Sequence, residues 1–565
     1  MNSFLKRTHL FAISSLLTVG LFAQKEEVPK GWHMLDKATS GYNGISIDKA
    51  YEFLKSKKLK SNTVIVAVID SGIDTTHEDL KSVLWVNKKE IPGNGIDDDK
   101  NGYVDDVHGW NFLGSRDGSK NVEQDSYESA RVYHKFKSKY DGKEIDENKL
   151  SKDEKFEYEM WKRSENEIAG GSKTSTVELM FLKKAYNSAV KSDSILRKAM
   201  SKEKFTGKEL EAFTTEEADV KKARAAFLSM FQANDMMETS NEEFLEGFGD
   251  YVNGEMKKAE ASEKAPIAYR GDVVKDNYAD FNDKFYGNPN VQVSNKSALH
   301  GTHVSGIIAA ARGNDKGMDG VADNVRIMSL RAVPDGDEHD KDIALAIRYA
   351  VDNGAQVINM SFGKGFSPEK GWVDDAVKYA ESKGVLLVHA AGNDAKNIDT
   401  AFNYPSPVFV KDNKRASNWI TVGASGDPKI GGYTASFSNY GKDEVDVFAP
   451  GVKIYATVPG GNTYNNLQGT SMASPVVAGL AALILEYYPN LSAQQVKYVI
   501  EKSASKPSEK VTIPGTDEEV ELSDISRSGG IINAYEALKL ASTLKGERNK
   551  NVKQTQSTVK PLKGF

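Results

Sequence analysis

Cysteine is absent from the 565-residue sequence. Its absence excludes a disulfide framework, a thiolate-bound zinc or iron–sulfur site, and a cysteine nucleophile. Charge of one sign is not in large excess either, because 80 acidic residues face 74 basic ones, for a net charge of −6. This near balance gives no basic surface of the kind that binds nucleic acid. At roughly 100–200 residues per domain, the length leaves room for one large domain with additional segments.

Proline is missing from one long internal stretch. None occurs from Gly93 through Ala265, although an even spread of the 16 prolines would place about five there. Thr214 with Glu217 matches a capping box within this stretch. Apolar residues recur there at helical spacing: Leu179, Leu182, Tyr186 and Ala189, then Val220, Ala223, Phe227 and Met230. We therefore predict a charged, mainly α-helical insertion over residues 120–265.

Long hydrophobic runs are scarce, and the clearest one lies at the N-terminus. Lys6 and Arg7 precede the apolar run Leu10–Phe22, and Ala23 offers a small residue before the sequence becomes charged. A run of this length is too short to span a membrane, which takes about 20 apolar residues, but it suits a cleaved signal peptide. We predict a signal peptide over 1–23, export to the periplasm or the extracellular space, and no stable membrane anchor. The alternative is an uncleaved N-terminal anchor.

Short apolar runs bounded by Gly, Asn and Asp predict strands that are buried on both faces, as in a parallel sheet. They are Thr63–Ile69, Val325–Leu330, Val357–Met360, Val385–Val388 and Trp419–Val422. Helical patterns over Asp340–Asn353 and Glu369–Lys383 alternate with them. Strand and helix in alternation indicate an α/β domain with right-handed crossovers.

This pattern divides the chain into six segments. Residues 24–60 form an N-terminal extension, and residues 545–565 form a polar tail. The α/β domain occupies residues 61–119 and 266–544, on either side of the insertion.

Three residues with acid, base and nucleophile chemistry lie where the chain leaves predicted strands or enters predicted helices. Asp70 directly follows the first strand, His300 opens His300-Gly301-Thr302-His303, and Ser471 lies in Gly469-Thr470-Ser471-Met472. Serine is a weak nucleophile near neutral pH, so a base must take its proton, and histidine suits that task. A buried carboxylate fixes the tautomer of the histidine and stabilises the imidazolium that forms. The set predicts acyl transfer through Ser471.

Two further features would stabilise negative charge on a reacting oxygen. Ser471 is expected to begin a helix, because Pro475 falls within the first turn, where a missing N–H costs little. Free backbone N–H groups at that end favour an anion. Asn393, after the strand Val385–Val388, would add a side-chain amide donor.

These motifs together resemble those of the subtilisin-like (subtilase) serine peptidases. The resemblance rests on Asp70-Ser71-Gly72, His300-Gly301-Thr302-His303-Val304, Asn359-Met360-Ser361-Phe362-Gly363, Ala391-Gly392-Asn393 and Gly469-Thr470-Ser471-Met472-Ala473-Ser474-Pro475. It covers residues 61–115 and 290–540, and the order Asp, His, Ser separates the chain from chymotrypsin-like peptidases and α/β-hydrolases. It implies an α/β fold with a doubly wound, mostly parallel sheet.

The resemblance also implies roles for individual residues. Ser471 would be the nucleophile, His300 the general base and acid, Asp70 its orienter, and Asn393 the oxyanion donor. Three residues would pair with the substrate backbone by strand addition: Ser361, Phe362 and Gly363. Three would line the other wall of the primary specificity pocket: Ala390, Ala391 and Gly392. We expect Asn403 at the base of that pocket and a large apolar or aromatic substrate side chain within it.

Two groups of residues predict structural calcium, and no cofactor is expected in catalysis. Asp97, Asp99, Asn101 and Asp105 resemble the opening of a calcium loop, although His108 stands where an EF-hand has glutamate. The alternative is an exposed acidic turn. From the resemblance alone, Asp79 and Asn314 fall where subtilisins bind a structural calcium.

Other residues invite functional readings that we consider weaker. His300 and His303 have a spacing that suits two zinc ligands on a helix, but no HExxH motif is present. We expect His303 and His389 to have structural roles. Arg270-Gly271-Asp272 spells an integrin-type tripeptide, which we treat as accidental.

The chain departs from the subtilase pattern in two ways. Asp70 and His300 stand 230 positions apart, where subtilisins have a few tens, and the 24–60 extension is short for an inhibitory propeptide.

We consider two functions for the chain. The first is an exported endopeptidase that acts on proteins or peptides. The second is a binding protein on a subtilase fold that works through its insertion, whose partner is unknown.

Overall fold

The computed structural model describes residues 28–168, 176–234, 236–237 and 239–548, and it divides into two compact units. One unit comprises Ser129–Ile267 and is helical. The other comprises the described residues up to Glu128 together with those from Ala268 onward, and it contains the sheet. The predicted signal peptide lies outside the described residues, as does most of the predicted tail.

Seven parallel strands form the main sheet, in the order β2-β3-β1-β4-β5-β6-β7. Their bounds are β1 (Val64–Asp70), β2 (Gly109–Asn111), β3 (Val325–Arg331), β4 (Val357–Met360), β5 (Leu386–Ala390), β6 (Trp419–Ser425) and β7 (Val447–Pro450). The chain extends the sheet first on one side of β1 and then on the other, which is the doubly wound pattern. The predicted α/β class is confirmed. The two strands that the sequence did not predict, β2 and β7, are short edge strands.

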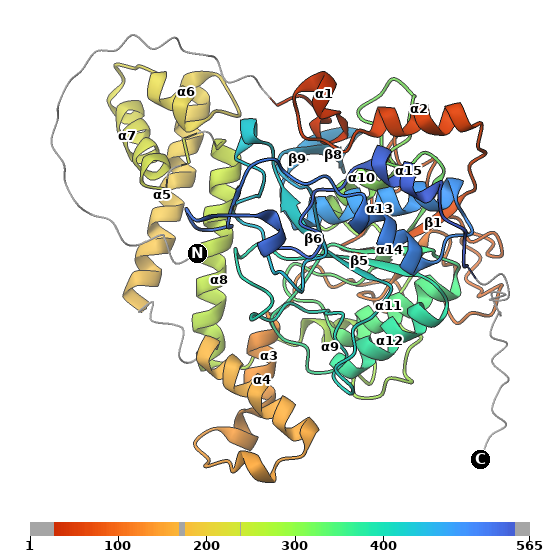
Figure 1. The fold of residues 1–565 in the computed structure, drawn as a ribbon. Helices are drawn as coiled ribbons and strands as arrows, with labels where there is room; N and C mark the ends of the chain where they lie inside the picture. Colours follow the sequence, from red (N-terminus) through yellow and green to blue (C-terminus); the bar gives the residue numbers. More distant parts are fainter. Residues whose placement is uncertain (1–27, 169–175, 235, 238, 549–565) are drawn as a thin grey trace. The chain divides into compact units, whose positions relative to one another are not determined.

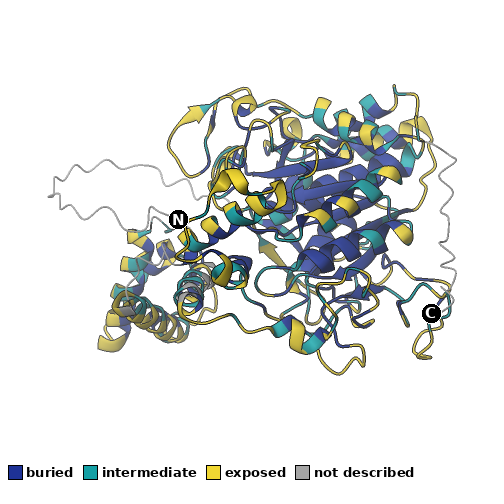
Figure 2. Cartoon of the chain, turned by 90° about the horizontal axis from the view of Figure 1, so that it is seen from below, coloured by how far each residue is buried: buried dark blue, intermediate teal, exposed yellow. Residues whose placement is uncertain are grey.

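Helices cover both faces of this sheet, and the sheet separates two hydrophobic cores (Figures 1 and 2). The first face carries α2 (Ile47–Lys57), α10 (Leu299–Ala309), α13 (Thr470–Tyr487), α14 (Ala493–Lys502) and α15 (Ala534–Ala541). The second carries α9 (Tyr269–Val274), α11 (Asp340–Asp352) and α12 (Lys370–Ser382). Smaller strands are β8 (Ile454–Val458), β9 (Thr463–Leu467), β10 (Val511–Thr512) and β11 (Glu519–Val520), and short 3₁₀ turns are η3 (Pro428–Ile430) and η4 (Leu522–Asp524).

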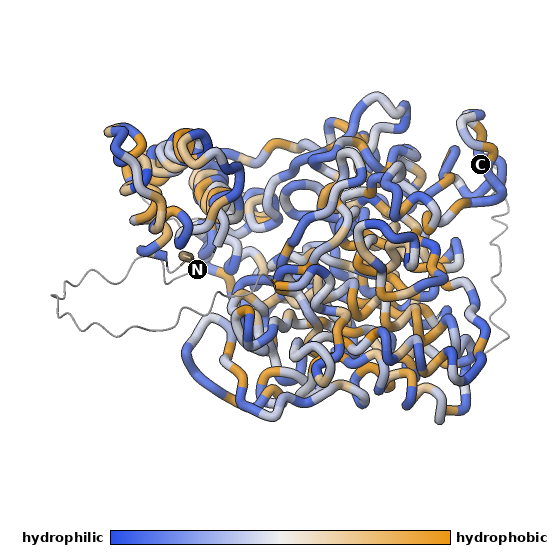
Figure 3. Tube along the Cα trace, turned by 90° about the horizontal axis from the view of Figure 1, so that it is seen from above, coloured by the Kyte–Doolittle hydropathy of each residue, from blue (hydrophilic) through white to orange (hydrophobic). Residues whose placement is uncertain are grey.

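Helix α13, which carries Ser471, is the most apolar long helix of the catalytic unit. Its length and composition would allow it to cross a membrane, but 89% of it is buried inside the protein. It packs against strands β4, β5, β6 and β7. Figure 3 shows the apolar residues gathered in the interior of this unit. The helix is therefore apolar because it is a core helix.

The helical unit has its own core of phenylalanine and leucine side chains, including Phe205, Phe227, Phe231 and Phe244. Its helices are α3 (Glu128–Tyr140), α4 (Lys152–Ile168), α5 (Thr176–Met200), α6 (Gly207–Ala212), α7 (Ala218–Ala233) and α8 (Asn241–Glu263), with the short turn η2 (Glu147–Lys149). The predicted capping box at Thr214 and Glu217 is wrong. The box forms one helix earlier, between Thr206 and Glu209 at the start of α6.

The N-terminal extension packs into the main core of the catalytic unit. It contains η1 (Trp32–Met34), α1 (Lys37–Ser40) and α2. Trp32 is fully buried, and its indole Nε1–H donates to Val452 O at 3.0 Å. Ile45, Ala50 and Leu54 join the same core. From Trp32 onward, the extension is therefore part of the folded catalytic unit.

This packing predicts a large loss of stability when Trp32 is replaced by alanine. Truncation of a buried tryptophan leaves a cavity and costs about 3–5 kcal/mol. Denaturant unfolding of Trp32→Ala is expected to show a loss of that size, whereas Glu52→Ala, on the exposed side of α2, is expected to change little. A Trp32→Ala variant as stable as the parent protein would contradict this account of the extension.

Candidate active site

The four predicted catalytic residues come from four different elements of the catalytic unit. Asp70 ends β1, His300 is the second residue of α10, Ser471 is the second residue of α13, and Asn393 follows β5. In an open parallel sheet, the carboxyl ends of the strands meet at one edge, beside the point where the strand order reverses. Here the order reverses around β1. The site lies where this topology predicts.

Asp70 and His300 are joined by a hydrogen bond. His300 Nδ1–H donates to Asp70 Oδ1 at 2.8 Å, and the same carboxylate oxygen accepts from the Ser71 N–H at 2.7 Å. Burial by itself would lower the pKa of His300. The charge of Asp70 and this hydrogen bond outweigh burial, so that the pKa is raised above its ordinary value.

A glycine permits this contact. A Cβ atom at Gly301 would lie 2.1 Å from Gly72 O and 3.2 Å from Asp70 Oδ1. Any larger residue after His300 would push α10 away from the end of β1. The Gly301 position in the motif is therefore a packing requirement of the Asp70–His300 pair.

Ser471 is linked to the residue that follows β4. Its Oγ–H donates to Ser361 O at 3.1 Å, and Ser361 Oγ–H donates in return to Ser471 O at 2.9 Å. Ser361 Oγ also accepts from Asn359 Nδ2 at 2.9 Å. This network holds the start of α13 against the end of β4. The serine hydroxyl thus points at Ser361 rather than at His300.

Two N–H donors converge beside Gly469. Asn393 Oδ1 accepts from the Thr470 N–H at 2.8 Å and from Thr470 Oγ1–H at 2.9 Å, which fixes the orientation of the amide. A Cβ atom at Gly469, whose φ is 150°, would lie 3.4 Å from Asn393 Nδ2 and 3.6 Å from Ser471 N. The space that this glycine leaves open therefore has both nitrogen atoms near it, together with Asn393 Oδ1 at 3.7 Å. Two N–H groups placed in this way are suited to bind an oxyanion.

The predicted specificity pocket has Asn403 between its walls. Asn403 Nδ2 donates to Ala391 O at 3.0 Å and to Ala390 O at 3.3 Å. On the other side, a Cβ atom at Gly363 would lie 2.7 Å from Asn403 Oδ1. Phe362, by contrast, packs its ring into the core, so only its backbone is available to a substrate.

His303 and His389 are buried and have backbone partners. His303 Nε2–H donates to Asn465 O at 3.1 Å, and His389 Nε2–H donates to Phe362 O at 2.8 Å. Burial lowers the pKa of His303 to about 3 and that of His389 to about 4. Both imidazoles are therefore neutral at physiological pH and serve the packing of the site.

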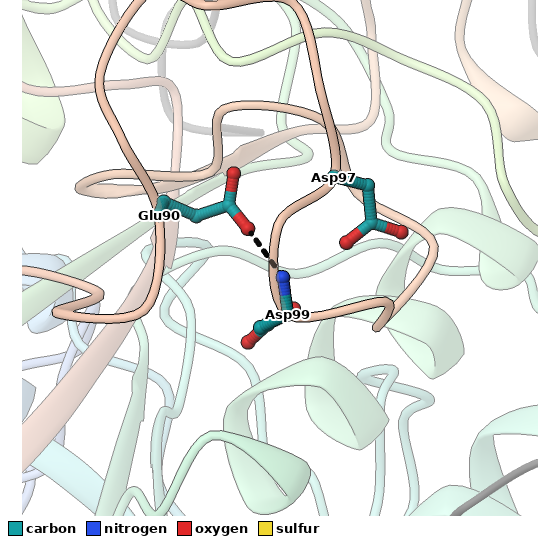
Figure 4. Close-up of side chains that lie close together, drawn as sticks. All are labelled: Glu90, Asp97 and Asp99. Carbon is teal, nitrogen blue, oxygen red and sulfur yellow. Dashed lines mark hydrogen bonds between the residues drawn. The ribbon is translucent and has the colours of Figure 1, made fainter.

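The predicted calcium loop brings only part of its residues together. Carboxylate oxygens of Asp97, Asp99 and Glu90 lie within 4.8 Å of one another, and Asp99 N–H donates to Glu90 Oε1 at 3.2 Å (Figure 4). Burial and the neighbouring aspartates raise the pKa of Glu90. Three convergent carboxylates fit a hard divalent cation. The sequence analysis missed Glu90, because it precedes the motif and belongs to no spacing pattern.

Asn101 and Asp105 are used differently from what the sequence suggested. Asn101 Nδ2–H donates to Asp106 Oδ2 at 2.9 Å. The carboxylate of Asp105 accepts from the backbone N–H groups of Gly93 and Gly95, at 2.8 and 2.9 Å. Asp105 therefore closes the neighbouring turn and is not one of the three convergent carboxylates.

Asp79 and Asn314 contact each other, as the resemblance implied, but through a hydrogen bond. Asn314 Nδ2–H donates to Asp79 Oδ1 at 2.6 Å, and the Tyr464 hydroxyl donates to Asp79 Oδ2 at 2.7 Å. Both oxygens of the buried carboxylate thus face protein donors. The two residues thus lie together as the resemblance implied, and the calcium ion between them remains a prediction.

Comparisons with known proteins agree with this geometry. The family model described as the subtilase family matches residues 61–521. The chain is 44% identical over 210 residues to the thermophilic serine proteinase of Bacillus sp. strain AK1, 41% identical over 210 residues to subtilisin DY of Bacillus licheniformis, and 37% identical over 280 residues to thermitase of Thermoactinomyces vulgaris.

These matches cover the chain and its relatives unequally. They span 37%, 36% and 49% of this chain, and 47%, 70% and 88% of the respective relatives. The chain thus spans about half the length of the Bacillus AK1 proteinase but most of thermitase. Because the family match extends over most of the sequence and includes Asp70, His300, Asn393 and Ser471, the chain belongs to the subtilase family of serine endopeptidases.

Proposed function

We propose that this endopeptidase is exported and cleaves peptide bonds through an acyl-enzyme on Ser471. The observation that carries the proposal is the convergence of Asn393 Nδ2 and Ser471 N on the space beside Gly469. Donors placed at that point would stabilise the charge that develops on a carbonyl oxygen under attack. The apolar run at the N-terminus supports export.

In the first half of the reaction, Ser471 attacks the carbonyl carbon of the substrate. Its hydroxyl leaves Ser361 O and turns to His300 Nε2, which takes the proton as the Oγ–carbon bond forms. Asp70 accepts from Nδ1–H throughout, which keeps Nε2 available as the base and stabilises the imidazolium. The carbonyl oxygen becomes an oxyanion between Asn393 and the Ser471 N–H.

Collapse of the tetrahedral intermediate then breaks the peptide bond. His300 gives its proton to the leaving amine, and the acyl group remains on Ser471 Oγ. A water molecule repeats the sequence, with His300 as base, and releases the acid product. No metal ion or cofactor takes part in these steps.

The substrate would lie as an added strand along the backbone of Ser361–Gly363. Its principal side chain would enter the pocket between Gly363 and Ala390–Gly392. Small residues in both walls leave room for a large apolar or aromatic group, and Asn403 adds polarity at the base.

We also propose a structural calcium ion held by Glu90, Asp97 and Asp99. The ion would neutralise three carboxylates that lie close together and would thus stabilise the 87–106 loop. The ion would act on stability and would not enter the catalytic steps.

A fluorophosphonate probe is expected to label the purified protein on Ser471. Labelling depends on an activated serine, so Ser471→Ala is expected to abolish it, whereas the exposed control Ser508→Ala is expected to retain it. Mass spectrometry of the labelled peptide identifies the site. If the parent protein fails to label under conditions where a subtilisin does, the binding-protein alternative is favoured instead.

The raised pKa of His300 predicts where activity is lost in acid. The free enzyme needs neutral His300, so kcat/KM is expected to fall as the pH drops through a value above about 6.5. Asp70→Asn removes the charge that raises this pKa. It is expected to move the acid limb to lower pH and to reduce kcat by about 10³–10⁴-fold. An acid limb that stays in place in Asp70→Asn would show that Asp70 does not set it.

Calcium is expected to raise the melting temperature of chelator-treated protein by a few degrees, since a ligand that binds only the folded state stabilises it. Differential scanning calorimetry with and without calcium measures the shift. Asp97→Asn is expected to abolish it, and the exposed control Asp375→Asn to keep it. An equal shift in both variants would place the ion elsewhere.

A further inference from the structure

A second pocket adjoins His300 within the catalytic unit. Its volume is about 410 Å³, and Asp70, His300 and Ser361 form one side of it. The residues that line the specificity pocket, Gly363, Ala390–Gly392 and Asn403, do not line this one. This pocket is therefore distinct from the predicted specificity pocket, and Ser361, the first residue of the predicted substrate-binding segment, belongs to its lining.

A short segment just before the helical unit forms the far wall of this pocket. The Val122 N–H donates to Leu113 O at 2.8 Å, and the segment then pairs with Asp335. The Asp335 N–H donates to Glu123 O at 2.8 Å, and the Asp125 N–H donates to Asp335 O at 2.9 Å. A Cβ atom at Gly336 would lie 2.2 Å from Asp125 O, so the two backbones are in close contact. The wall is therefore a paired backbone that holds Glu123 in place.

Two exposed carboxylates, Glu123 and Asp335, belong to the lining of the pocket. Glu123 accepts from Ser294 Oγ–H at 2.6 Å, which directs its carboxylate. The positive charge of the buried Arg331 also acts on Glu123. Asp335 faces Lys296 at 3.7 Å, and both are largely exposed. Asp70 is paired with His300, so Glu123 and Asp335 are the carboxylates that a substrate side chain could reach in this pocket.

The lining also contains three apolar side chains next to the polar residues Ser71, Gln124 and Ser297. Leu299, Val333 and Pro334 lie beside the two carboxylates. Lysine and arginine have long aliphatic stems that cover apolar surface while the charged end stays in water. A pocket with an apolar side and a solvated carboxylate edge therefore matches the shape and chemistry of these side chains.

Strand geometry determines which substrate residue reaches this pocket. Side chains of an extended peptide alternate between its two sides. If one side chain enters the pocket at Asn403, its neighbours in the peptide point to the other side, and we assign the preceding one to the pocket beside His300. The two pockets thus receive consecutive residues.

We propose that the pocket bounded by Glu123 and Asp335 selects a lysine or arginine at the substrate position that precedes the residue held at Asn403. Glu123 is a specificity-determining residue, supplied by the segment that leads into the helical unit. The inference rests on the proposed endopeptidase function, because it assumes that the substrate lies along Ser361–Gly363.

The test uses peptides that share one large apolar residue for the Asn403 pocket and carry lysine, glutamine or glutamate at the preceding position. At low ionic strength, the parent enzyme is expected to favour the lysine peptide over the glutamine peptide by about fivefold in kcat/KM. E123Q is expected to reduce this ratio toward one, and high salt should do the same. The exposed control E518Q is expected to keep the parent ratio.

Charge reversal gives a readout that a folding defect would not produce. E123K is expected to favour the glutamate peptide over the lysine peptide, with the parent enzyme showing the opposite order. Binding of the same labelled peptides to S471A, which keeps Glu123, is measured by fluorescence polarisation. The lysine peptide is expected to have a lower Kd than the glutamine and glutamate peptides, in line with the preference of the parent enzyme.

The two readouts keep this inference apart from the proposed function. A parent protein that hydrolyses none of the peptides would contradict the proposed function, and the binding order on S471A would still decide the inference. The inference would be overturned if the lysine and glutamine peptides had equal affinity or equal kcat/KM. It would also be overturned if E123Q kept the parent ratio of kcat/KM between these two peptides.

Discussion

The hydrogen bond between Asp70 and His300 joins residues that stand 230 positions apart, and the position of the imidazole in the site depends on it. Its formation requires α10 to lie directly against the turn after β1, which the absence of a side chain at Gly301 allows. The helical unit intervenes in the sequence between these two residues, but the contact itself lies within the catalytic unit. The insertion therefore had to leave and re-enter that unit without disturbing the end of β1.

The point of departure gives the insertion a consequence for the site. Residues Val122–Asp125 pair with Leu113 and Asp335 and belong to the catalytic unit, and the chain enters the helical unit at Ser129. The segment that carries the chain out of the sheet thus also forms a wall beside His300. A substitution in Val122–Asp125 would therefore alter both the pocket beside His300 and the link between the sheet and the helical unit.

Two buried cationic side chains of the catalytic unit are paired with carboxylates. Lys364, which follows the substrate-binding segment, contacts Glu128 and Asp340 at 2.8 and 2.9 Å. Arg270 contacts Asp276 and Asp342 at 2.6 and 2.7 Å and is almost fully buried. Loss of one partner would leave an uncompensated buried charge, which is strongly destabilising. The Arg270-Gly271-Asp272 tripeptide is therefore structural at its arginine, which is not available as a surface recognition motif.

The sequence by itself determined the fold class, five of the seven strands and the residues that form the catalytic group. It could do so because buried parallel strands have a local apolar signature, and because the catalytic residues occur in short motifs at strand ends and helix starts. It did not reveal the edge strands β2, which has only three residues, and β7, which ends in proline. Only the tertiary structure brought Glu90 to Asp97 and Asp99, turned Asp105 to the backbone of Gly93 and Gly95, and placed hydrogen-bond donors on both oxygens of Asp79. Glu123 likewise reached the pocket beside His300 through pairing with Asp335, a partner more than 200 positions away. These contacts depend on how loops pack across the ends of the sheet, and no local pattern records which distant loop will lie next to which.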